Sequence, residues 1–299
     1  MRVLVTGASG HIGSAVVPEL LGAGHQVIGL ARSDSAAEVI AGLGAEVRRG
    51  DLDDLDSLRE AAASADGVIH LASRAASAGD FAAAIAAHLR AIEAIGDALI
   101  GTDKPFAAVG GTMMLAFAGI TGRPGTERDV LESGPGVEAE AALFALAGRG
   151  VRTSVLRLPP LVHSTLDHHG FTPTLIAIAR AKGVSGYVGD GANRWPATHT
   201  LDVARLFRLA LEQAPAGSRL HAVADEGVAF REIAETIGRH LDVPVKSVPA
   251  EDAAEHFSYL GGFVGLDNPV SSAHTRELLG WQPTHPGLID DLDQGHYFG

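Results

Sequence analysis

Three glycines spaced three residues apart follow the first apolar run of the chain, in the stretch Thr6-Gly7-Ala8-Ser9-Gly10-His11-Ile12-Gly13. Residues 2–6 have the composition of a buried strand, and residues 12–23 carry apolar side chains at helical spacing. At such a junction Gly7 permits a tight turn, Gly10 lets the backbone approach a pyrophosphate, and Gly13 allows close packing of helix on strand. The free N–H groups and partial positive charge of a helix N-terminus favour an anion there. The stretch therefore predicts a dinucleotide-binding unit rather than a turn that merely needs a positive φ.

Short apolar runs alternate with longer helical patterns through the first half of the chain. We predict strands at 2–6, 26–31, 45–49, 67–72, 106–109 and 152–158. Six buried strands that alternate with helices predict an α/β fold of the Rossmann type, a doubly wound parallel sheet with a smaller C-terminal substrate lobe. We expect residues 1–160 to form the dinucleotide-binding domain, with 198–215 returning to it, and 161–197 and 216–299 to form the lobe. Helical spacing also predicts helices over 202–213, 230–241 and 272–279.

The composition excludes several classes of protein. The formal net charge is −13 without a run of lysines and arginines, which disfavours nucleic acid and anionic membranes as partners. The chain has no cysteine, so disulfides, thiol catalysis and cysteine-ligated metals are excluded. No apolar stretch reaches the roughly 18 residues of a membrane span, and no secretory signal opens the sequence. We expect a cytoplasmic protein with a small-molecule substrate, and we leave its assembly open between a monomer and a homodimer.

The end of the second predicted strand indicates which dinucleotide the turn would hold. Arg32 stands 19 residues beyond Gly13, where a protein that prefers NAD(H) usually has an acidic residue for the ribose 2′-hydroxyl. A guanidinium pairs with a 2′-phosphate in a bidentate way, and Ser33 adds a hydroxyl donor. We therefore predict NADP(H) as the cofactor, while Asp34, the next residue, keeps NAD(H) open.

Two further segments follow predicted strands at the same edge of the sheet. Asp51 can accept a hydrogen bond from an adenine amino group, with Leu52 beside the ring, although residues 51–56 can also simply cap the next helix. Residues 71–73 are positioned to line the cofactor trough at the carboxyl ends of the strands. The cofactor-binding set predicted from these patterns is Gly7, Ser9, Gly10, His11, Ile12, Gly13, Arg32, Ser33, Asp51, Leu52, Leu71, Ala72 and Ser73.

Several stretches together carry a family resemblance. They are Thr6-Gly7-x-x-Gly10-x-x-Gly13, Gly50-Asp51-Leu52, Val68-Ile69-His70-Leu71-Ala72, Arg157-Leu158-Pro159-Pro160 and residues 195–204. Over nearly its whole length the chain resembles the extended or atypical branch of the short-chain dehydrogenase/reductase superfamily, near the NAD-dependent epimerase/dehydratase and 3β-hydroxysteroid dehydrogenase-like members. The resemblance implies that the segment after the sixth strand passes the nicotinamide, which adds Pro159 and Leu161 to the expected cofactor-binding residues.

The same resemblance implies a Tyr-x-x-x-Lys pair, in which the lysine lowers the pKa of a proton-donating tyrosine. This chain has no such pair: its tyrosines are Tyr187, Tyr259 and Tyr297, and its lysines are Lys104, Lys182 and Lys246. The family's catalytic hydroxyl has a counterpart in Thr112, after the fifth predicted strand. That threonine either hydrogen-bonds a substrate carbonyl or merely caps the strand end.

Three residues are candidates for the missing acid, and each also has a purely structural interpretation. His163 follows the segment expected to pass the nicotinamide, and an imidazole can act near neutral pH. His199 lies near Asp202 in the returning segment, and Tyr187 precedes a glycine-rich turn from which a phenol can enter the substrate cleft. Histidines crowd residues 163–169, but loop clustering shows no convergent ligands, so we predict no metal site. Glu140, near a predicted helix start, is interpreted as solvent-facing.

The first functional hypothesis is an NADP(H)-dependent oxidoreductase that moves a hydride to or from a small carbonyl or alcohol held near Thr112. The second is a nonenzymatic NADP(H)-binding sensor or regulator, because the nucleotide turn is intact while the proton-donating pair is absent. A third is an epimerase or dehydratase that uses the cofactor transiently. A Ser/His/Asp hydrolase is excluded, because residues 183–186 hold only a fragment of its nucleophile motif.

Overall fold

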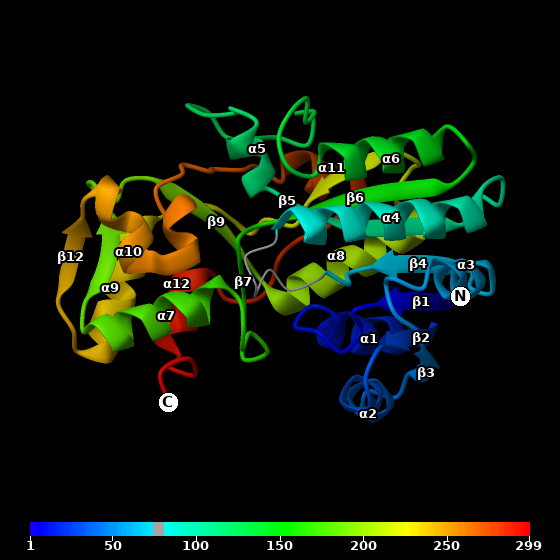
Figure 1. Cartoon of the computed structure of the whole chain (residues 1–299), viewed down its shortest axis with the longest axis horizontal. Coiled ribbons are helices and arrows are strands. Elements are labelled where there is room, and N and C mark those ends of the chain that lie inside the picture. The colour runs from blue at the N-terminus through cyan, green and yellow to red at the C-terminus, as the bar shows by residue number, and fades with distance from the viewer. Residues whose placement is uncertain (74–80) are drawn as a thin grey trace.

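The computed structural model describes residues 1–73 and 81–299, and its larger part is built around one parallel sheet (Figure 1). Seven strands lie in the order β10-β6-β5-β4-β1-β2-β3. Their bounds are β1 Arg2–Thr6, β2 Gln26–Ala31, β3 Glu46–Arg49, β4 Gly67–His70, β5 Pro105–Gly111, β6 Arg152–Leu158 and β10 Ser218–His221. The predicted doubly wound α/β fold is confirmed, and the six predicted strands are present with their ends shifted by one or two residues in β3, β4 and β5.

Helices cover both faces of this sheet, which explains why its strands read as continuous apolar runs. In β1, Val3 and Val5 join the core beneath α1 and α8, whereas Leu4 joins the core beneath α3, α4 and α6. The bounds of these helices are α1 Gly13–Gly22, α2 Asp34–Gly42, α3 Leu55–Ala63, α4 Phe81–Leu99, α6 Val137–Ala147 and α8 Thr200–Gln213. The short helix α5 (Met113–Phe117) follows β5 and packs partly into the core of the lobe. In the described ranges 1–73 and 81–299, no helix has the length and apolarity needed to span a bilayer.

A smaller lobe lies at the other end of the molecule, together with the C-terminus (Figure 1). It contains α7 Phe171–Lys182, β8 Ser185–Val188, α9 Phe230–Leu241, β12 Val245–Val248, α10 Ala253–Phe257 and α12 Leu288–Asp293. A three-stranded sheet in the order β11-β9-β7 joins it to the larger part, with β7 Leu161–His163, β9 Arg194–His199 and β11 Asp225–Ala229. Its core is separate from the cores of the large sheet and gathers aromatic side chains such as Trp195, Phe230 and Phe257.

The C-terminal part of the chain returns to the large sheet more often than expected. Strand β10 pairs with β6, and Trp281, just after α11 (Ala273–Leu279), lies in the core shared by α1 and α8. The indole of Trp281 donates to the backbone oxygen of Asp202 at 3.0 Å. We expected residues 216–299 in the lobe, but β10 and α11 pack with the larger part. Strand β10 has a single strongly apolar residue, Leu220, so its pairing with β6 leaves little trace in the local pattern.

Candidate functional site

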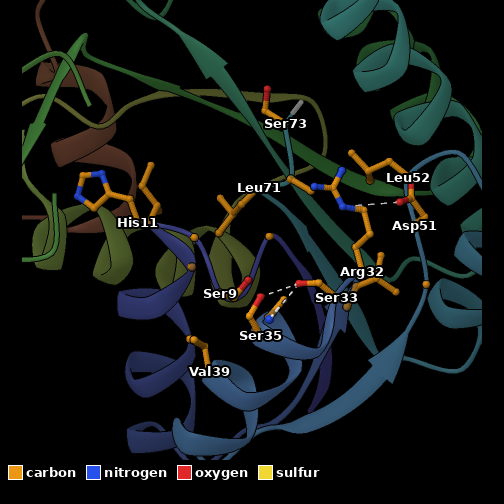
Figure 2. A pocket seen from close by; sticks show the side chains of 18 residues that line it. Ser9, His11, Arg32, Ser33, Ser35, Val39, Asp51, Leu52, Leu71 and Ser73 are labelled. Atoms are coloured by element: carbon orange, nitrogen blue, oxygen red, sulfur yellow. Dashed lines mark hydrogen bonds and ion pairs between the residues drawn. The ribbon is translucent and has the colours of Figure 1, made fainter. Parts of the chain in front are cut away.

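The carboxyl ends of β1, β2 and β4 border a cavity of about 880 Å³, at the edge where sheets of this kind bind ligands. Its walls come from the turn after β1, the start of α2 and the residues that follow β3 and β4 (Figure 2). Apart from Pro159 and Leu161, every expected cofactor-binding residue lines this cavity. Leu30, Ser35, Ala36, Val39 and Gly50 also line it and were not predicted.

The glycine turn is packed so tightly that larger side chains would not fit. A Cβ on Gly13 would lie 2.0 Å from the backbone oxygen of Gly7, and a Cβ on Gly7 would lie 2.8 Å from the backbone nitrogen of Ala72. Gly7 also has a φ of 72°, which favours glycine. The turn is closed by the N–H of Gly10, which donates to the oxygen of Gly7 at 3.0 Å. These contacts hold the backbone of the turn against the ends of β1 and β4.

The start of α1 borders this cavity through Ile12 and Gly13, while the N–H of the next residue, Ser14, already donates to the oxygen of Gly10 at 2.8 Å. The N-cap residue is Ile12, and no side chain in the described ranges caps this N-terminus by a hydrogen bond. An uncapped helix N-terminus presents N–H groups and a partial positive charge. This arrangement fits the diphosphate of a dinucleotide, which accepts such hydrogen bonds and needs a close backbone approach.

The opposite end of the cavity gathers Arg32 with two hydroxyls (Figure 2). The side chain of Arg32 is 76% exposed, and its Nε lies 3.9 Å from a carboxyl oxygen of Asp51. The Oγ of Ser33 caps α2 by accepting from the N–H of Ala36 at 3.2 Å, and it lies 2.9 Å from the Oγ of Ser35. Ser33 therefore has a local capping role that the sequence patterns did not predict.

Acidic groups at this end are already engaged. Asp34 is paired with Arg49 of β3, so its charge is partly neutralised by a neighbour. The carboxyl of Asp51 accepts from the N–H of Asp53 at 3.0 Å. Leu52 lines the cavity and packs against the core beneath α3. The Asp51–Leu52 step thus presents a carboxylate and an apolar surface side by side, as the adenine prediction requires.

The expected catalytic residues do not line this cavity. Thr112 is fully buried, and its hydroxyl accepts a hydrogen bond from the amide of Asn268 at 3.2 Å. Tyr187 is buried in the lobe, where the guanidinium carbon of Arg231 lies 5.2 Å from its ring centre. The structure therefore separates these two candidates from the glycine turn.

The two histidine candidates lie against each other, with ring centres 5.6 Å apart. Nδ1 of His163 is 2.9 Å from a carboxyl oxygen of Asp291, and its buried Nε2 has no hydrogen-bond partner among the described residues. His199 stacks on His285 at 4.6 Å, and its Nδ1 accepts from the N–H of Leu201 at 3.3 Å. The pKa of His199 is lowered to about 4. Burial is the largest cause, and the neighbouring imidazoles of His163 and His285 add to it.

Pro159, in the connection between β6 and β7, and Leu161, the first residue of β7, do not line the cavity. Both are buried, and Leu161 packs into the core of the lobe. The family resemblance rather than local chemistry led to these two residues. The described walls of the cavity do not reach them.

A polar cluster that the sequence patterns did not reveal lies beside His11. Asp167 faces its imidazole at 3.6 Å, and the hydroxyl of Tyr297 donates to Asp167 at 3.3 Å. Burial lowers the pKa of His11 to about 4 and raises the pKa of Asp167 to about 6. Burial also raises the pKa of Tyr297 well above its ordinary value. These residues are 156 and 130 positions apart in sequence, so no local motif could have joined them.

The comparisons with known proteins agree with this geometry. Residues 3–98, which include the glycine turn, match the NAD dependent epimerase/dehydratase family. The chain is 46% identical to the uncharacterized protein C2A9.02 of Schizosaccharomyces pombe, with all of both chains covered. It is 28% identical to 4-hydroxy-2-methyl-3-oxo-4-farnesyl-3,4-dihydroquinoline-1-oxide ketoreductase of Stigmatella aurantiaca, covering 86% of this chain and 79% of that protein. The fold matches that of a dTDP-glucose 4,6-dehydratase from Streptomyces venezuelae with NAD bound, at a TM-score of 0.79 and 21% identity over 99% of this chain and 96% of the other.

Proposed function

Because the chain belongs to the NAD-dependent epimerase/dehydratase family of extended short-chain dehydrogenases/reductases, we propose that it is an NADP(H)-dependent oxidoreductase acting on a small carbonyl or alcohol. The observation that carries the proposal is the 880 Å³ cavity, which combines the glycine turn and the uncapped α1 with Arg32 at its other end. A bound nicotinamide dinucleotide would supply or accept the hydride. The residues of the chain bind it, orient it and handle the proton.

The preference for NADP(H) is supported by the charges around the second strand. The guanidinium of Arg32 is largely exposed and is 3.9 Å from its nearest carboxylate, so it can turn toward an incoming phosphate. The hydroxyls of Ser33 and Ser35 lie within 2.9 Å of each other beside it. Asp34, which would repel a phosphate, is paired with Arg49. These three features favour a 2′-phosphate over a 2′-hydroxyl.

The proton-handling groups we propose are His163 and Thr112. The Nε2 of His163 lacks a partner among the described residues, while Asp291 fixes the other ring nitrogen. A nitrogen held in this way can exchange a proton with a substrate oxygen once the substrate enters. The hydroxyl of Thr112 is the proposed partner of the substrate oxygen. His199 and Tyr187 are weaker candidates, because the pKa of His199 is low and the ring of Tyr187 is packed into the lobe.

The first experiment titrates the purified protein with NADPH and with NADH. Replacing Arg32 with alanine is expected to weaken NADPH binding roughly 10- to 100-fold and leave NADH binding nearly unchanged, since a hydrogen bond to a charged group contributes about 1.5–3 kcal/mol. The matched control is Arg59→Ala, which removes a surface arginine that pairs with Asp56 on α3. Equal losses for NADPH and NADH in Arg32→Ala would contradict the proposed preference.

The second experiment follows the loss of nicotinamide absorbance with a panel of ketones and aldehydes. Thr112→Val and His163→Asn are expected to lower kcat at least tenfold while nucleotide binding persists, because both act on the substrate oxygen rather than on the dinucleotide. Turnover that is unaffected by both substitutions would assign the chemistry to other residues.

A sensor function is the second candidate, because the Tyr-x-x-x-Lys pair is absent and Thr112 is already hydrogen-bonded to Asn268. In that case the oxidised and reduced cofactors would change the affinity for a partner protein. Tight NADPH binding without turnover on any substrate would favour this candidate. An epimerase or dehydratase remains the alternative enzyme class, and product analysis of sugar-nucleotide substrates would identify it.

A further inference from the structure

His11 joins the wall of the cavity to the segment that follows β7. Its Nδ1 lies 3.6 Å from Oδ1 of Asp167, and its Nε2 lies 2.8 Å from Oγ1 of Thr200. The imidazole is 23% exposed, whereas the Asp167 carboxyl is fully buried. The His11–Asp167 pair thus has one member at the cavity and one in the interior.

The hydrogen bonds around Thr200 determine which nitrogen of His11 carries the hydrogen. The hydroxyl of Thr200 donates to the backbone oxygen of His163 at 3.1 Å and accepts from the hydroxyl of Ser164 at 2.8 Å. Its oxygen must therefore accept from Nε2 of His11 as well. The neutral imidazole then has its lone pair on Nδ1, which faces the carboxyl of Asp167. A proton taken up by His11 would go to this nitrogen.

Asp167 is held in place by donors that leave its charge only partly compensated. It accepts from the N–H of Gly170 at 2.8 Å and from the hydroxyl of Tyr297 at 3.3 Å. Within residues 1–73 and 81–299, the ion pair found for this carboxylate is the one with His11. A buried carboxylate without a full positive partner gains when its neighbour becomes protonated.

The surroundings keep His11 neutral when the cavity holds no anion. Burial is the largest cause of its low pKa, and the neighbouring imidazoles of His168, His163 and His199 add to it. The titratable groups that face the imidazole come from four parts of the chain. They are His163 from the end of β7, Asp167 and His168 from the segment after it, His199 from the end of β9, and Tyr297 from the C-terminal segment. A negative charge in the cavity would raise the pKa of the His11 imidazole, because an opposite charge stabilises its protonated form.

We propose that the His11–Asp167 pair takes up one proton when the diphosphate of a nicotinamide dinucleotide enters the cavity. Above about pH 6, where the Asp167 carboxyl is ionised, the proton comes from solvent and binds Nδ1 of His11, which converts the pair into an imidazolium and a carboxylate. The imidazolium then lies between two negative groups, the carboxylate of Asp167 and the anion on the glycine turn. This inference rests on the proposed dinucleotide site and specifies a pH-dependent binding role for His11.

The test measures NADPH affinity and proton uptake by calorimetry in buffers of different ionisation enthalpy, from about pH 6 to about pH 8. One linked proton changes the dissociation constant by up to about tenfold per pH unit. The variant His11→Gln keeps a side-chain N–H for Thr200 but cannot be protonated. We expect the wild type to take up more protons per NADPH than His11→Gln, and its affinity relative to that variant to fall as the pH rises. The 2′-phosphate titrates in both proteins, so it cancels in the difference.

Two further variants sharpen the comparison. Asp167→Asn removes the carboxylate that stabilises the imidazolium, and we expect it to reduce the proton uptake. His25→Gln is the matched control, because His25 pairs with Glu212 away from the cavity and should keep the wild-type uptake. Equal proton uptake in the wild type and His11→Gln would overturn the inference while leaving the proposed function intact. Failure of the wild type to bind any nicotinamide dinucleotide would overturn both.

A second measurement covers the case in which the variants do not fold. Nuclear magnetic resonance of labelled histidines in the wild-type protein follows the protonation of His11 directly. We expect the pKa of His11 to rise from about 4 by at least about two units when NADPH is added, which brings it into the pH range of the calorimetry. A pKa that stays unchanged in the saturated protein would overturn the inference.

Discussion

Gly13 stands where the first helix meets the turn, and its α-carbon has room for hydrogen alone. The nearest obstruction to a Cβ is the backbone oxygen of Gly7 at 2.0 Å, which cannot move aside as a flexible side chain could. Substitution of side chains that line the cavity is expected to lower affinity for the proposed dinucleotide. A Cβ at Gly13 would instead force the backbone of the turn to move. The close packing around this one residue therefore sets the shape of the proposed pyrophosphate site.

Gly13→Ala is expected to destabilise the protein by roughly 3 kcal/mol or more and to abolish NADPH binding, because strain in a packed core must be relieved by moving the backbone of the turn. Gly22→Ala in the same helix is the control, since a Cβ there meets nothing within 4 Å. Urea unfolding and NADPH titration measure both effects. A fully stable Gly13→Ala protein with normal binding would contradict this account of the turn.

At the scale of elements, a buried ion pair ties α6 to β6. Both guanidinium nitrogens of Arg157 that face Glu140 donate to its carboxyl oxygens at 2.7 Å, and both side chains are almost fully buried. The interpretation of Glu140 as solvent-facing is thus wrong. Its position near a helix start is real, but the helix turns this residue toward the sheet. A buried arginine on β6 needs a partner for its charge, and the carboxylate on α6 provides it.

Glu140→Ala is expected to cost about 3–5 kcal/mol, because it leaves the Arg157 guanidinium buried without its carboxylate. Glu138→Ala, on the exposed side of the same helix, is expected to change stability by less than about 0.5 kcal/mol. Chemical denaturation of both variants measures the difference. Similar stabilities for the two variants would argue against a structural role for the buried pair.

Over the whole molecule, buried histidines make stability depend on pH. Burial lowers the pKa of His70 and His88, which stack at 4.9 Å, and lowers the pKa of His11, His199 and His221 to about 4. The unfolded chain, with histidine pKa values near 6.5, therefore binds more protons than the folded one below about pH 6.5. The contribution of these neutral histidines to the free energy of unfolding is complete above about pH 6.5 and is lost as the pH falls toward 4.

Protonation of Asp167 affects stability in the opposite direction. Its pKa is raised from 3.8 to about 6, so the folded state binds this proton first and gains stability as the pH falls through 6. Together with His256, whose pKa is also lowered by burial, six histidines oppose one aspartate, and we expect a net loss of stability between about pH 6.5 and about pH 5. His88→Gln, which keeps a donor for the oxygen of Val109, should flatten this slope. Thermal unfolding over that range measures it, and constant or increasing stability would contradict the sign.

The expected cytoplasmic location and the open choice between monomer and homodimer stay predictions. The whole-molecule division is clearer: the larger part holds the cavity, and the sheet of β7, β9 and β11 joins it to the lobe (Figure 1). We propose that the lobe binds the substrate.

The features that could be predicted from the amino-acid sequence are those that depend on neighbouring residues. The glycine spacing, the apolar strand runs and the residues that directly follow β1, β2, β3 and β4 predicted a Rossmann-type sheet and most of the cavity wall. Local steric rules explain this success, because a strand end, a turn and a helix start are consecutive residues. Tertiary structure alone decided which distant residues meet. The pairing of β10 with β6, the burial of Glu140 and the approach of Asp167 to His11 each join segments whose contact depends on how the layers pack. Such contacts follow from the shared core, and no short stretch of sequence contains them.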